Sequence, residues 1–273
     1  MSNMLEMLED LALSVRRAVL PLLGDALSAR TVGRGAGGDR TRLIDARAES
    51  AILDEIERIG LSCTIISEEA GTLSVGRNPE ENYLIIDPLD GTTNALHGIP
   101  FIATSIAIAT KPLLSSIKAA VVLDIIHNTL YKAEKSRGAY RDSERIKPSD
   151  EEDVVESVVG VDINFFNMKD LKLHPKLGEL LLINKHPRYF GANALQLCFV
   201  ADGKSDAFID VRGKLRIVDM AAAYLIVKEA GAVVTDLEGR ELEAEATPQT
   251  RIALVASGNE VLHRKILNFL KGQ

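Results

Sequence analysis

Tryptophan is absent from this chain of 273 residues, and aromatic residues make up only 4% of it. The two cysteines, Cys63 and Cys198, stand alone in apolar settings, which argues against a disulfide, a zinc site or a cysteine nucleophile and favours buried thiols in a reducing compartment. No apolar run is long enough to span a membrane, and charges such as Glu6, Asp10 and Arg16 interrupt the N-terminal segment where a signal peptide would be apolar. These absences predict a cytoplasmic protein without a membrane partner.

An excess of basic residues is also lacking. Lysine and arginine number 32 against 39 aspartates and glutamates, which gives a net charge of −7, and no basic run carries interleaved aromatics. Nucleic acid is therefore a poor partner for this surface. With 46% hydrophobic residues, the chain can bury a large core. We expect one domain over residues 1–273, with two halves that meet near the charged stretch 141–153.

The spacing of the hydrophobic residues predicts helices and strands that alternate in blocks. A period near 3.6 or a compact apolar run predicts helices at 4–23, 41–59, 171–182, 194–201, 219–230 and 261–270. Short apolar or β-branched runs predict strands at 61–67, 84–86, 102–110, 119–126, 129–133, 155–161, 207–211, 232–236 and 252–256. Such alternation is typical of a layered α/β or α+β domain.

The most informative segment is 83–94, where an apolar strand runs into Asp-Pro-Leu-Asp-Gly-Thr-Thr-Asn. Pro88 stiffens the exit from the strand, so Asp87 and Asp90 are held close together. Two adjacent carboxylates without Cys or His favour a hard ion such as Mg²⁺ or Mn²⁺. Gly91 and Thr92, at the next helix start, can offer backbone N–H groups to a phosphate. The alternative is an ordinary turn in which Asp90 caps a helix.

Two other acidic segments belong to the same argument. Glu68 ends a predicted strand nineteen positions before Asp87, so the two strand ends can lie side by side, although Glu68-Glu69 alone is more often a solvated loop. Asp219 opens a predicted helix, where the alternative role is an N-cap. A G-x-G-x-x-G run at 33–38 follows a helix rather than a strand, which favours a mobile loop over a nucleotide site.

Taken together, these segments resemble the inositol monophosphatase family, including its archaeal members that act as fructose-1,6-bisphosphatases. The resemblance extends from about residue 39 to about residue 236. It implies the family's αβαβα layered sandwich with the metal site between its two halves, and a homodimer. It also implies Mg²⁺, with Mn²⁺ possible, as two or three ions.

Matched to the family's motifs, several residues acquire expected roles. The expected metal ligands are Glu68, Asp87, the carbonyl of Leu89, Asp90 and Asp219. Asp45 and Thr92 resemble the pair that orients and deprotonates a metal-bound water, and Glu68 is expected to take part in catalysis with them. Asp39 is a candidate for holding a third, weaker ion. Clustered divalent ions can supply an activated water, charge neutralisation and leaving-group stabilisation in phosphate-ester hydrolysis.

Substrate choice is expected to rest on residues around the leaving sugar. Arg212 lies seven positions before Asp219, where animal members carry a Glu, and a cation there favours a second phosphate. Arg188 resembles another substrate contact of the archaeal group. Read alone, each arginine is a solvated surface cation. The remaining expected substrate contacts are Asp90, Gly91, Thr92 and Asn193. Ala192 and Asn193 depart from the family's Ser- or Thr-containing motif.

The resemblance implies a phosphomonoester hydrolase that acts on fructose-1,6-bisphosphate, inositol-1-phosphate or both. It also permits a 3′(2′),5′-bisphosphate nucleotide phosphatase, although the chain is short for that group and offers no candidate adenine pocket. A third hypothesis is a catalytically idle family member that serves as a binding module.

Overall fold

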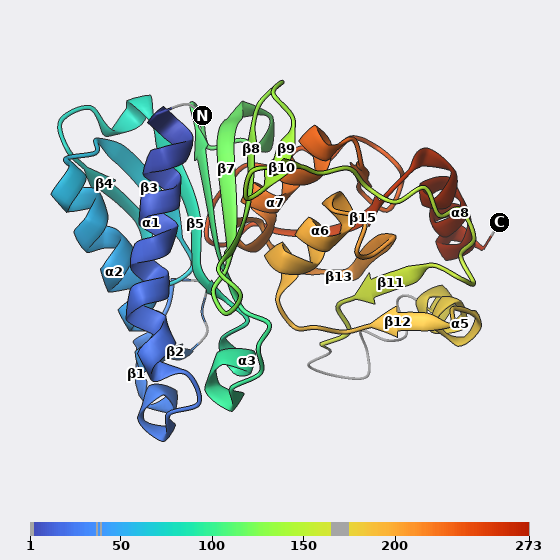
Figure 1. Cartoon of the computed structure of the whole chain (residues 1–273), viewed down its shortest axis with the longest axis horizontal. Helices are drawn as coiled ribbons and strands as arrows, with labels where there is room; N and C mark the ends of the chain where they lie inside the picture. The colour runs from blue at the N-terminus through green and yellow to red at the C-terminus, as the bar shows by residue number, and fades with distance from the viewer. Residues whose placement is uncertain (1–2, 37, 39, 165–174, 273) are drawn as a thin grey trace.

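The chain folds into five layers, helix–sheet–helix–sheet–helix, arranged along the long axis of the molecule (Figure 1). The structure is a computed structural model and describes residues 3–36, 38, 40–164 and 175–272. The predicted αβαβα sandwich is confirmed, and each layer follows from where the sequence places its apolar residues.

The first layer consists of α1 (Asn3–Val19) and α2 (Leu43–Ile59). Each is amphipathic and buries one stripe against the first sheet, with Leu8 and Leu11 of α1 and Ile52 of α2 inaccessible to solvent. Both helices were predicted from this spacing. Gly60 ends α2 with a left-handed φ of 66°, a conformation that glycine adopts without a steric penalty.

Eight strands form the second layer, in the spatial order β10-β9-β8-β7-β6-β5-β3-β4. They are β3 (Cys63–Ser67), β4 (Gly71–Val75), β5 (Tyr83–Asp90), β6 (Ala103–Ala109), β7 (Ile117–Asp124), β8 (Thr129–Glu134), β9 (Ala139–Arg141) and β10 (Glu144–Arg145). The pair β3–β5 is parallel, whereas the other pairs in this sheet are antiparallel. The predicted hairpin at 119–133 is present, and Asn128 takes a positive φ of 56° in its turn.

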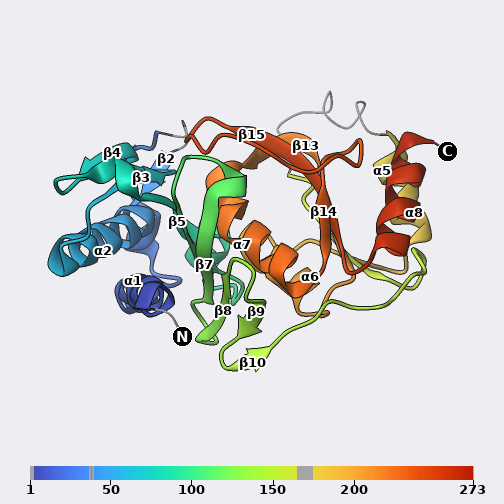
Figure 2. The same ribbon diagram turned by 90° about the horizontal axis from the view of Figure 1, so that it is seen from above.

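The third layer lies between the two sheets and contains α6 (Asn193–Ala201) and α7 (Ile217–Ala230) (Figure 2). Because α7 packs against sheets on both sides, it is apolar all round, and every residue from Ile217 to Val227 is buried. The run of small side chains Ala221, Ala222 and Ala223 lets the sheets approach it closely.

The second sheet and the last helices complete the molecule. The sheet has the order β12-β11-β13-β15-β14, with strands β11 (Val158–Val161), β12 (His186–Arg188), β13 (Ala207–Arg216), β14 (Val233–Thr235) and β15 (Arg251–Ser257). Its outer face is covered by α5 (Pro175–Ile183) and α8 (Glu260–Lys271). The predicted start of the first of these helices, at 171, lies outside the described residues.

One expectation near the N-terminus was wrong in part. Residues 33–38 were predicted to be a loop, but Gly33 and Arg34 belong to β1 (Thr31–Arg34), which forms an antiparallel hairpin with β2 (Arg40–Arg42) in which Gly33 pairs with Thr41. The polar sequence gave no period-two signal because all four residues of β1 are exposed. The hairpin leads directly into α2, so the glycine run is not the strand–turn–helix of a dinucleotide site.

Short elements make the remaining connections: α3 (Thr92–His97) and the 3₁₀ turns η1 (Leu20–Leu22), η2 (Ala26–Ala29), η3 (Pro79–Glu81) and η4 (Leu114–Ser116). Three apolar clusters fill the spaces between the five layers, and the largest surrounds α6 and α7. Within the described part of the chain, no helix combines the length and apolarity that crossing a bilayer would require.

Candidate active site

The parallel pairing of β3 with β5 brings the first two acidic segments together. Ser67 pairs with Ile86 at the carboxyl ends of the two strands, and Glu68 and Asp87 follow directly. The carboxyl ends of parallel strands share one edge of a sheet, so the sequence expectation that these side chains are neighbours is confirmed.

The central motif continues the strand instead of ending it. β5 was predicted to stop before Asp87, but it runs to Asp90, which pairs with Ala103 after a shift of register between the two aspartates. Pro88, which has no N–H to donate, lies within this irregular part of the strand, as its chemistry requires. The N–H of Leu89 donates to Asp87 Oδ1 at 3.1 Å and fixes that carboxylate.

Two helix starts of the same pattern supply the other acids. Arg42-Leu43-Ile44-Asp45 opens α2, and an Arg-Ile-Val-Asp run ending at Asp219 opens α7. In each, the aspartate is the third helical residue and accepts the backbone N–H of the arginine at the N-cap, at 2.9 Å for Asp45 Oδ2. This hydrogen bond satisfies a helix-end donor and points the carboxylate toward the site.

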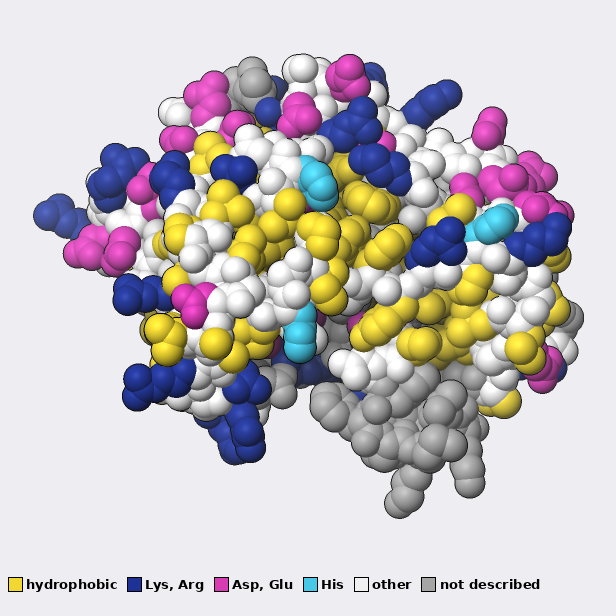
Figure 3. Space-filling view, turned by 60° about the horizontal axis from the view of Figure 1, so that its bottom comes forward, with side chains coloured by type: hydrophobic (Ala, Val, Ile, Leu, Met, Phe, Trp, Pro, Cys, Tyr) yellow, Lys and Arg dark blue, Asp and Glu magenta, His cyan; other side chains and the backbone are white. Residues whose placement is uncertain are grey.

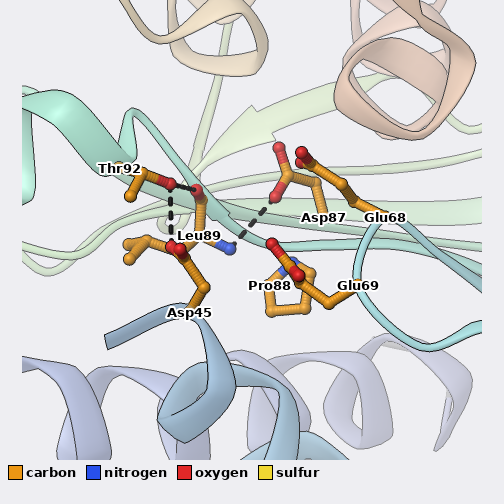
Figure 4. A pocket seen from close by; sticks show the side chains of 7 residues that line it. All are labelled: Asp45, Glu68, Glu69, Asp87, Pro88, Leu89 and Thr92. Atoms are coloured by element: carbon orange, nitrogen blue, oxygen red, sulfur yellow. Dashed lines mark hydrogen bonds between the residues drawn. The ribbon is translucent and has the colours of Figure 1, made fainter. Parts of the chain in front are cut away.

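Three carboxylates from the two halves of the chain converge. Oxygens of Glu68, Asp87 and Asp219 all lie within 4.8 Å of one another. Figure 4 shows the carboxylates of Glu68 and Asp87 side by side, on the far side of Leu89 from the pair Asp45–Thr92. Asp219 Oδ1 is buried without a hydrogen-bond partner. Clustered carboxylate oxygens, one of which lacks a hydrogen-bond partner, are suitable ligands for a hard divalent cation.

The raised pKa values of these carboxylates also favour a bound cation. Burial, followed by the charges of neighbours led by Asp219, raises the pKa of Glu68 to about 9. Burial first and the charge of Asp219 second also raise the pKa values of Asp87 and Asp90. The pKa of Asp219 rises to about 6, because burial outweighs the opposing charges of nearby arginines. Without a cation, this concentration of negative charge is unfavourable.

Thr92 and Asp45 form a hydrogen-bonded pair at the edge of this group. The hydroxyl of Thr92 donates to Asp45 Oδ1 at 2.8 Å and lies 3.3 Å from the carbonyl of Leu89. Burial raises the pKa of Asp45, while the N–H of Arg42 and the hydroxyl of Thr92 oppose that rise. Both side chains and Leu89 line one small cavity with Glu68 and Asp87.

Asp90 takes a different position. Its Oδ1 accepts the backbone N–H of Asn193 at 3.0 Å and its Oδ2 that of Ala194 at 2.7 Å, so it caps α6. It is not in the three-carboxylate group, although it lies near enough for Asp219 to shift its pKa. The adjacent Gly91 has a φ of +90°, and a β-carbon there would lie 3.2 Å from Ala192. Glycine is therefore required where the two halves touch.

The two expected substrate arginines do not line the cavity. Arg212 is buried and pairs through Nη2 with Asp162 and with Asp210, at 2.6 Å each. Arg188 lies exposed on β12 and donates to the carbonyl of its neighbour Pro187. Asn193 is at the first turn of α6, beside Asp90. The remaining candidate, Asp39, lies outside the described residues.

Sequence reasoning missed three residues at this site. Glu69, which was not among the expected ligands, lines the cavity and accepts a hydrogen bond from the hydroxyl of Thr41. Glu49 is buried beneath it and accepts the hydroxyl of Ser67 at 2.9 Å. Arg216 contacts Glu68 Oε1 at 3.0 Å. A signal for Glu49 was available, since it lies one helical turn after Asp45 on the same face.

Comparison with known proteins agrees with this geometry. The family model described as the inositol monophosphatase family matches residues 3–271. A fructose-1,6-bisphosphatase/inositol-1-monophosphatase of Methanothermobacter thermautotrophicus is 36% identical over 269 residues, which cover 96% of this chain and 94% of that protein. A bifunctional NADP phosphatase/NAD kinase of Methanococcus maripaludis is 34% identical over 97% of this chain, which spans 49% of its length.

Solved structures show the same likeness. A crystal structure of an inositol monophosphatase–fructose 1,6-bisphosphatase superposes with a TM-score of 0.83 at 30% identity, covering 99% of this chain and 100% of the other. The extragenic suppressor protein SuhB of Bartonella henselae gives 0.84, also at 30% identity, and 99% of each chain is covered. The chain therefore belongs to the inositol monophosphatase family and is a phosphatase.

Proposed function

We propose that this protein is a Mg²⁺-dependent phosphomonoester hydrolase that releases phosphate from fructose-1,6-bisphosphate, inositol-1-phosphate or both. The observation that carries the proposal is the convergence of Glu68, Asp87 and Asp219 within 4.8 Å, beside the Asp45–Thr92 pair. Mn²⁺ is an alternative ion of the same ligand preference, and two or three ions are expected.

The site residues have separate proposed roles in ion binding, proton transfer and phosphate binding. Glu68, Asp87, the Leu89 carbonyl, Asp90 and Asp219 hold the ions. When bound, the ions supply a water of lowered pKa and neutralise the phosphate charge. Asp45 would accept the proton of the attacking water through the Thr92 hydroxyl, to which it is hydrogen-bonded at 2.8 Å, and Glu68 would help to orient that water. The backbone N–H groups of Gly91 and Thr92 bind the phosphate.

Substrate choice is assigned to residues on the second half. Arg212, Arg188 and Asn193 are the proposed contacts, together with Asp90, which accepts the backbone N–H of Asn193. Arg212 is held by Asp162 and Asp210, so a substrate phosphate would have to compete with two carboxylates for its guanidinium group. Support for both substrates comes from relatives that are named fructose-1,6-bisphosphatase/inositol-1-monophosphatase.

A second candidate substrate is a nucleotide phosphate. The relatives named NADP phosphatase/NAD kinase match nearly the whole of this chain at 34% and 31% identity. That likeness favours NADP as the first nucleotide to test, ahead of a 3′(2′),5′-bisphosphate nucleotide. A catalytically idle binding module is the remaining alternative.

The decisive experiment is a phosphate-release panel. Fructose-1,6-bisphosphate, inositol-1-phosphate, NADP and a 3′,5′-bisphosphate nucleotide are compared with Mg²⁺, with Mn²⁺ and with a chelator. We expect phosphate to be released from fructose-1,6-bisphosphate and inositol-1-phosphate. The chelator should abolish this release, and Mg²⁺ should restore it. Preference for NADP would reassign the substrate, and no release from any compound would overturn the proposal.

We further propose a cytoplasmic homodimer. Figure 3 shows a broad band of hydrophobic side chains across one face of the molecule. The half-buried rings of Phe101, Phe190 and Phe199 pack together, with centroids 4.6 Å apart for the first two, and Ile99 nearby is 47% exposed. Exposed apolar clusters of this kind favour a partner surface, here a second copy.

Light scattering of the wild type and of Ile99→Asp tests the proposed homodimer. We expect a dimeric wild type that the substitution dissociates, and a monomeric wild type would contradict the proposal.

A further inference from the structure

Arg216 carries a charge opposite to that of the carboxylate cluster, and its contacts reach both halves of the chain. Its Nη2 lies 3.0 Å from Oε1 of Glu68, which follows β3 in the first half. Its Nη1 lies 3.8 Å from Oδ2 of Asp219, three residues later in α7. The first distance is that of a charge-assisted hydrogen bond.

The local fold fixes this arrangement. Arg216 is the last residue of β13 and the N-cap of α7, so its backbone N–H binds the carboxylate of Asp219 while its side chain extends toward Glu68. All three side chains are largely withdrawn from solvent, at 20%, 18% and 9% exposure for Arg216, Glu68 and Asp219. An ion pair at this depth is screened less than one on the surface.

A second arginine lies next to Arg216. Arg251 is directly opposite Arg216 in the antiparallel pair β13–β15. Like charges in that relation destabilise a sheet, and the charge of Arg216 contributes to lowering the pKa of Arg251 after burial. The carboxylates of Glu68 and Asp219 offset this repulsion, since the charge of Arg251 acts on both of them. The guanidinium group of Arg251 donates to the carbonyls of Pro248 and Thr250, whereas that of Arg216 contacts Glu68 directly.

We propose that Arg216 is a resident counter-ion of the metal site, which holds Glu68 and Asp219 together when no ion is bound and competes with the ion for Glu68. The inference rests on the proposed function, because it takes the cluster to be the metal site. Arg216 is thus a positioning residue: it sets the affinity for the divalent ion and holds the two halves of the metal-free protein in register.

The start of α2 has the same Arg-x-x-Asp pattern as the start of α7 and provides a comparison. Arg42 stands at the same place before Asp45 and gives it the same backbone hydrogen bond, but its guanidinium group donates to the carbonyl of Ala29 and the hydroxyl of Thr31. The pattern Arg-x-x-Asp therefore shapes the helix start in both cases. The contact with a ligand carboxylate is specific to Arg216.

The test measures Mn²⁺ binding by calorimetry to chelator-treated protein, together with melting temperatures in chelator and in Mn²⁺. The variants are Arg216→Gln, which removes the charge, and Arg216→Lys, which keeps it. Arg42→Gln is the matched control, and Arg251→Gln tests a nearby charge that acts on the cluster without the direct contact to Glu68. We expect Arg216→Gln to melt at a lower temperature in chelator and to bind Mn²⁺ about tenfold more tightly, since a competing cation has been removed. Arg216→Lys should stay close to the wild type.

The outcomes separate the two proposals. A fall in melting temperature that is equal in chelator and in Mn²⁺, with unchanged affinity, would show a merely structural role and overturn the inference. An equal gain in affinity for Arg251→Gln would also overturn it, because the effect would then be one of general charge. If the wild type binds no Mn²⁺ or Mg²⁺, the proposed function fails, and competition at Glu68 fails with it. A wild type that binds the ion with an affinity equal to that of Arg216→Gln would overturn the inference alone.

Discussion

Asp90, the last residue of β5 in the first half, accepts a 2.7 Å hydrogen bond from the backbone N–H of Ala194 in the first turn of α6, 104 positions later. One side chain thus lies near enough to the three-carboxylate group to be affected by the charge of Asp219, and it also caps a helix of the opposite half. Capping by aspartate stabilises a helix by about 1 kcal/mol, and here the same bond also joins the two halves.

Replacing Asp90 by Asn should therefore affect both chemistry and stability. The amide keeps one acceptor but turns a donor toward the N–H of Asn193 or Ala194, which we expect to lower the free energy of unfolding in Mg²⁺ by about 1–3 kcal/mol. Phosphate release should fall by ~100-fold. Denaturation and the phosphate assay measure the two effects. Asp54→Asn, at an exposed position of α2, is the control, and an unchanged stability of Asp90→Asn would contradict the capping role.

The hydroxyl of Thr92 can be removed at nearly constant volume. Thr92→Val loses the 2.8 Å bond to Asp45, and we expect kcat to fall by about 100-fold or more because a proton-transfer group is lost. Thr92 is only half-buried, so the melting temperature should change little. Thr92→Ser should restore most of the rate. Failure of Ser to rescue would indicate that the methyl group matters instead.

The pairing of Arg212 leads to a test of substrate choice. Asp162→Asn releases one of the two carboxylates that hold the guanidinium group, so Arg212 should become more available to a second phosphate. We expect KM for fructose-1,6-bisphosphate to fall relative to that for inositol-1-phosphate, by up to about tenfold, the equivalent of one charge-assisted hydrogen bond. Arg212→Gln should shift the ratio in the opposite direction. Ratios that do not move in either variant would remove Arg212 from substrate recognition.

A buried histidine makes stability depend on pH. His263 contacts the hydroxyls of Thr235 and Ser257 at 2.8 and 3.2 Å, and burial lowers its pKa to about 4. Its pKa in the unfolded chain is near ~6.5, so between these values the unfolded state binds more protons than the folded state. Stability therefore falls as the pH drops from about 6.5 toward 4, by up to ~3 kcal/mol.

Melting temperatures at pH 7 and pH 5, measured with Mg²⁺ present, check this expectation. His263→Gln should be less stable than the wild type at pH 7, because it loses the contacts of the buried imidazole with Thr235 and Ser257. It should lose less stability on acidification. An identical pH dependence in the two proteins would assign the acid sensitivity to other groups.

Much of the fold could be predicted from the sequence, since the apolar residues of α1 and α2 recur with the period of an amphipathic α-helix. Proximity of Glu68 and Asp87 followed from two strand ends and the rule that neighbouring elements pair. The β1–β2 hairpin did not follow, because its exposed, glycine-rich strands carry no hydrophobic pattern.

The limits at the site have a different physical origin. Nothing local in the sequence reveals that Arg212 is neutralised by Asp162, because that contact depends on how β11 and β13 pair. Likewise the contact of Arg216 with Glu68 joins opposite halves and arises only once these have packed. Sequence motifs identified Glu68, Asp87 and Asp219, the three acids of the cluster, whereas the partners that balance their charge required the tertiary structure.

The contacts that span the two halves also bear on kinetics. Asp90 with Ala194, and Glu68 with Arg216, join segments that are remote in sequence, and we expect contacts of such long separation to form late in folding. Interactions formed after the folding transition state slow unfolding and leave the folding rate nearly unchanged. We therefore expect the lifetime of the folded protein, more than the speed at which it forms, to depend on these few charged side chains.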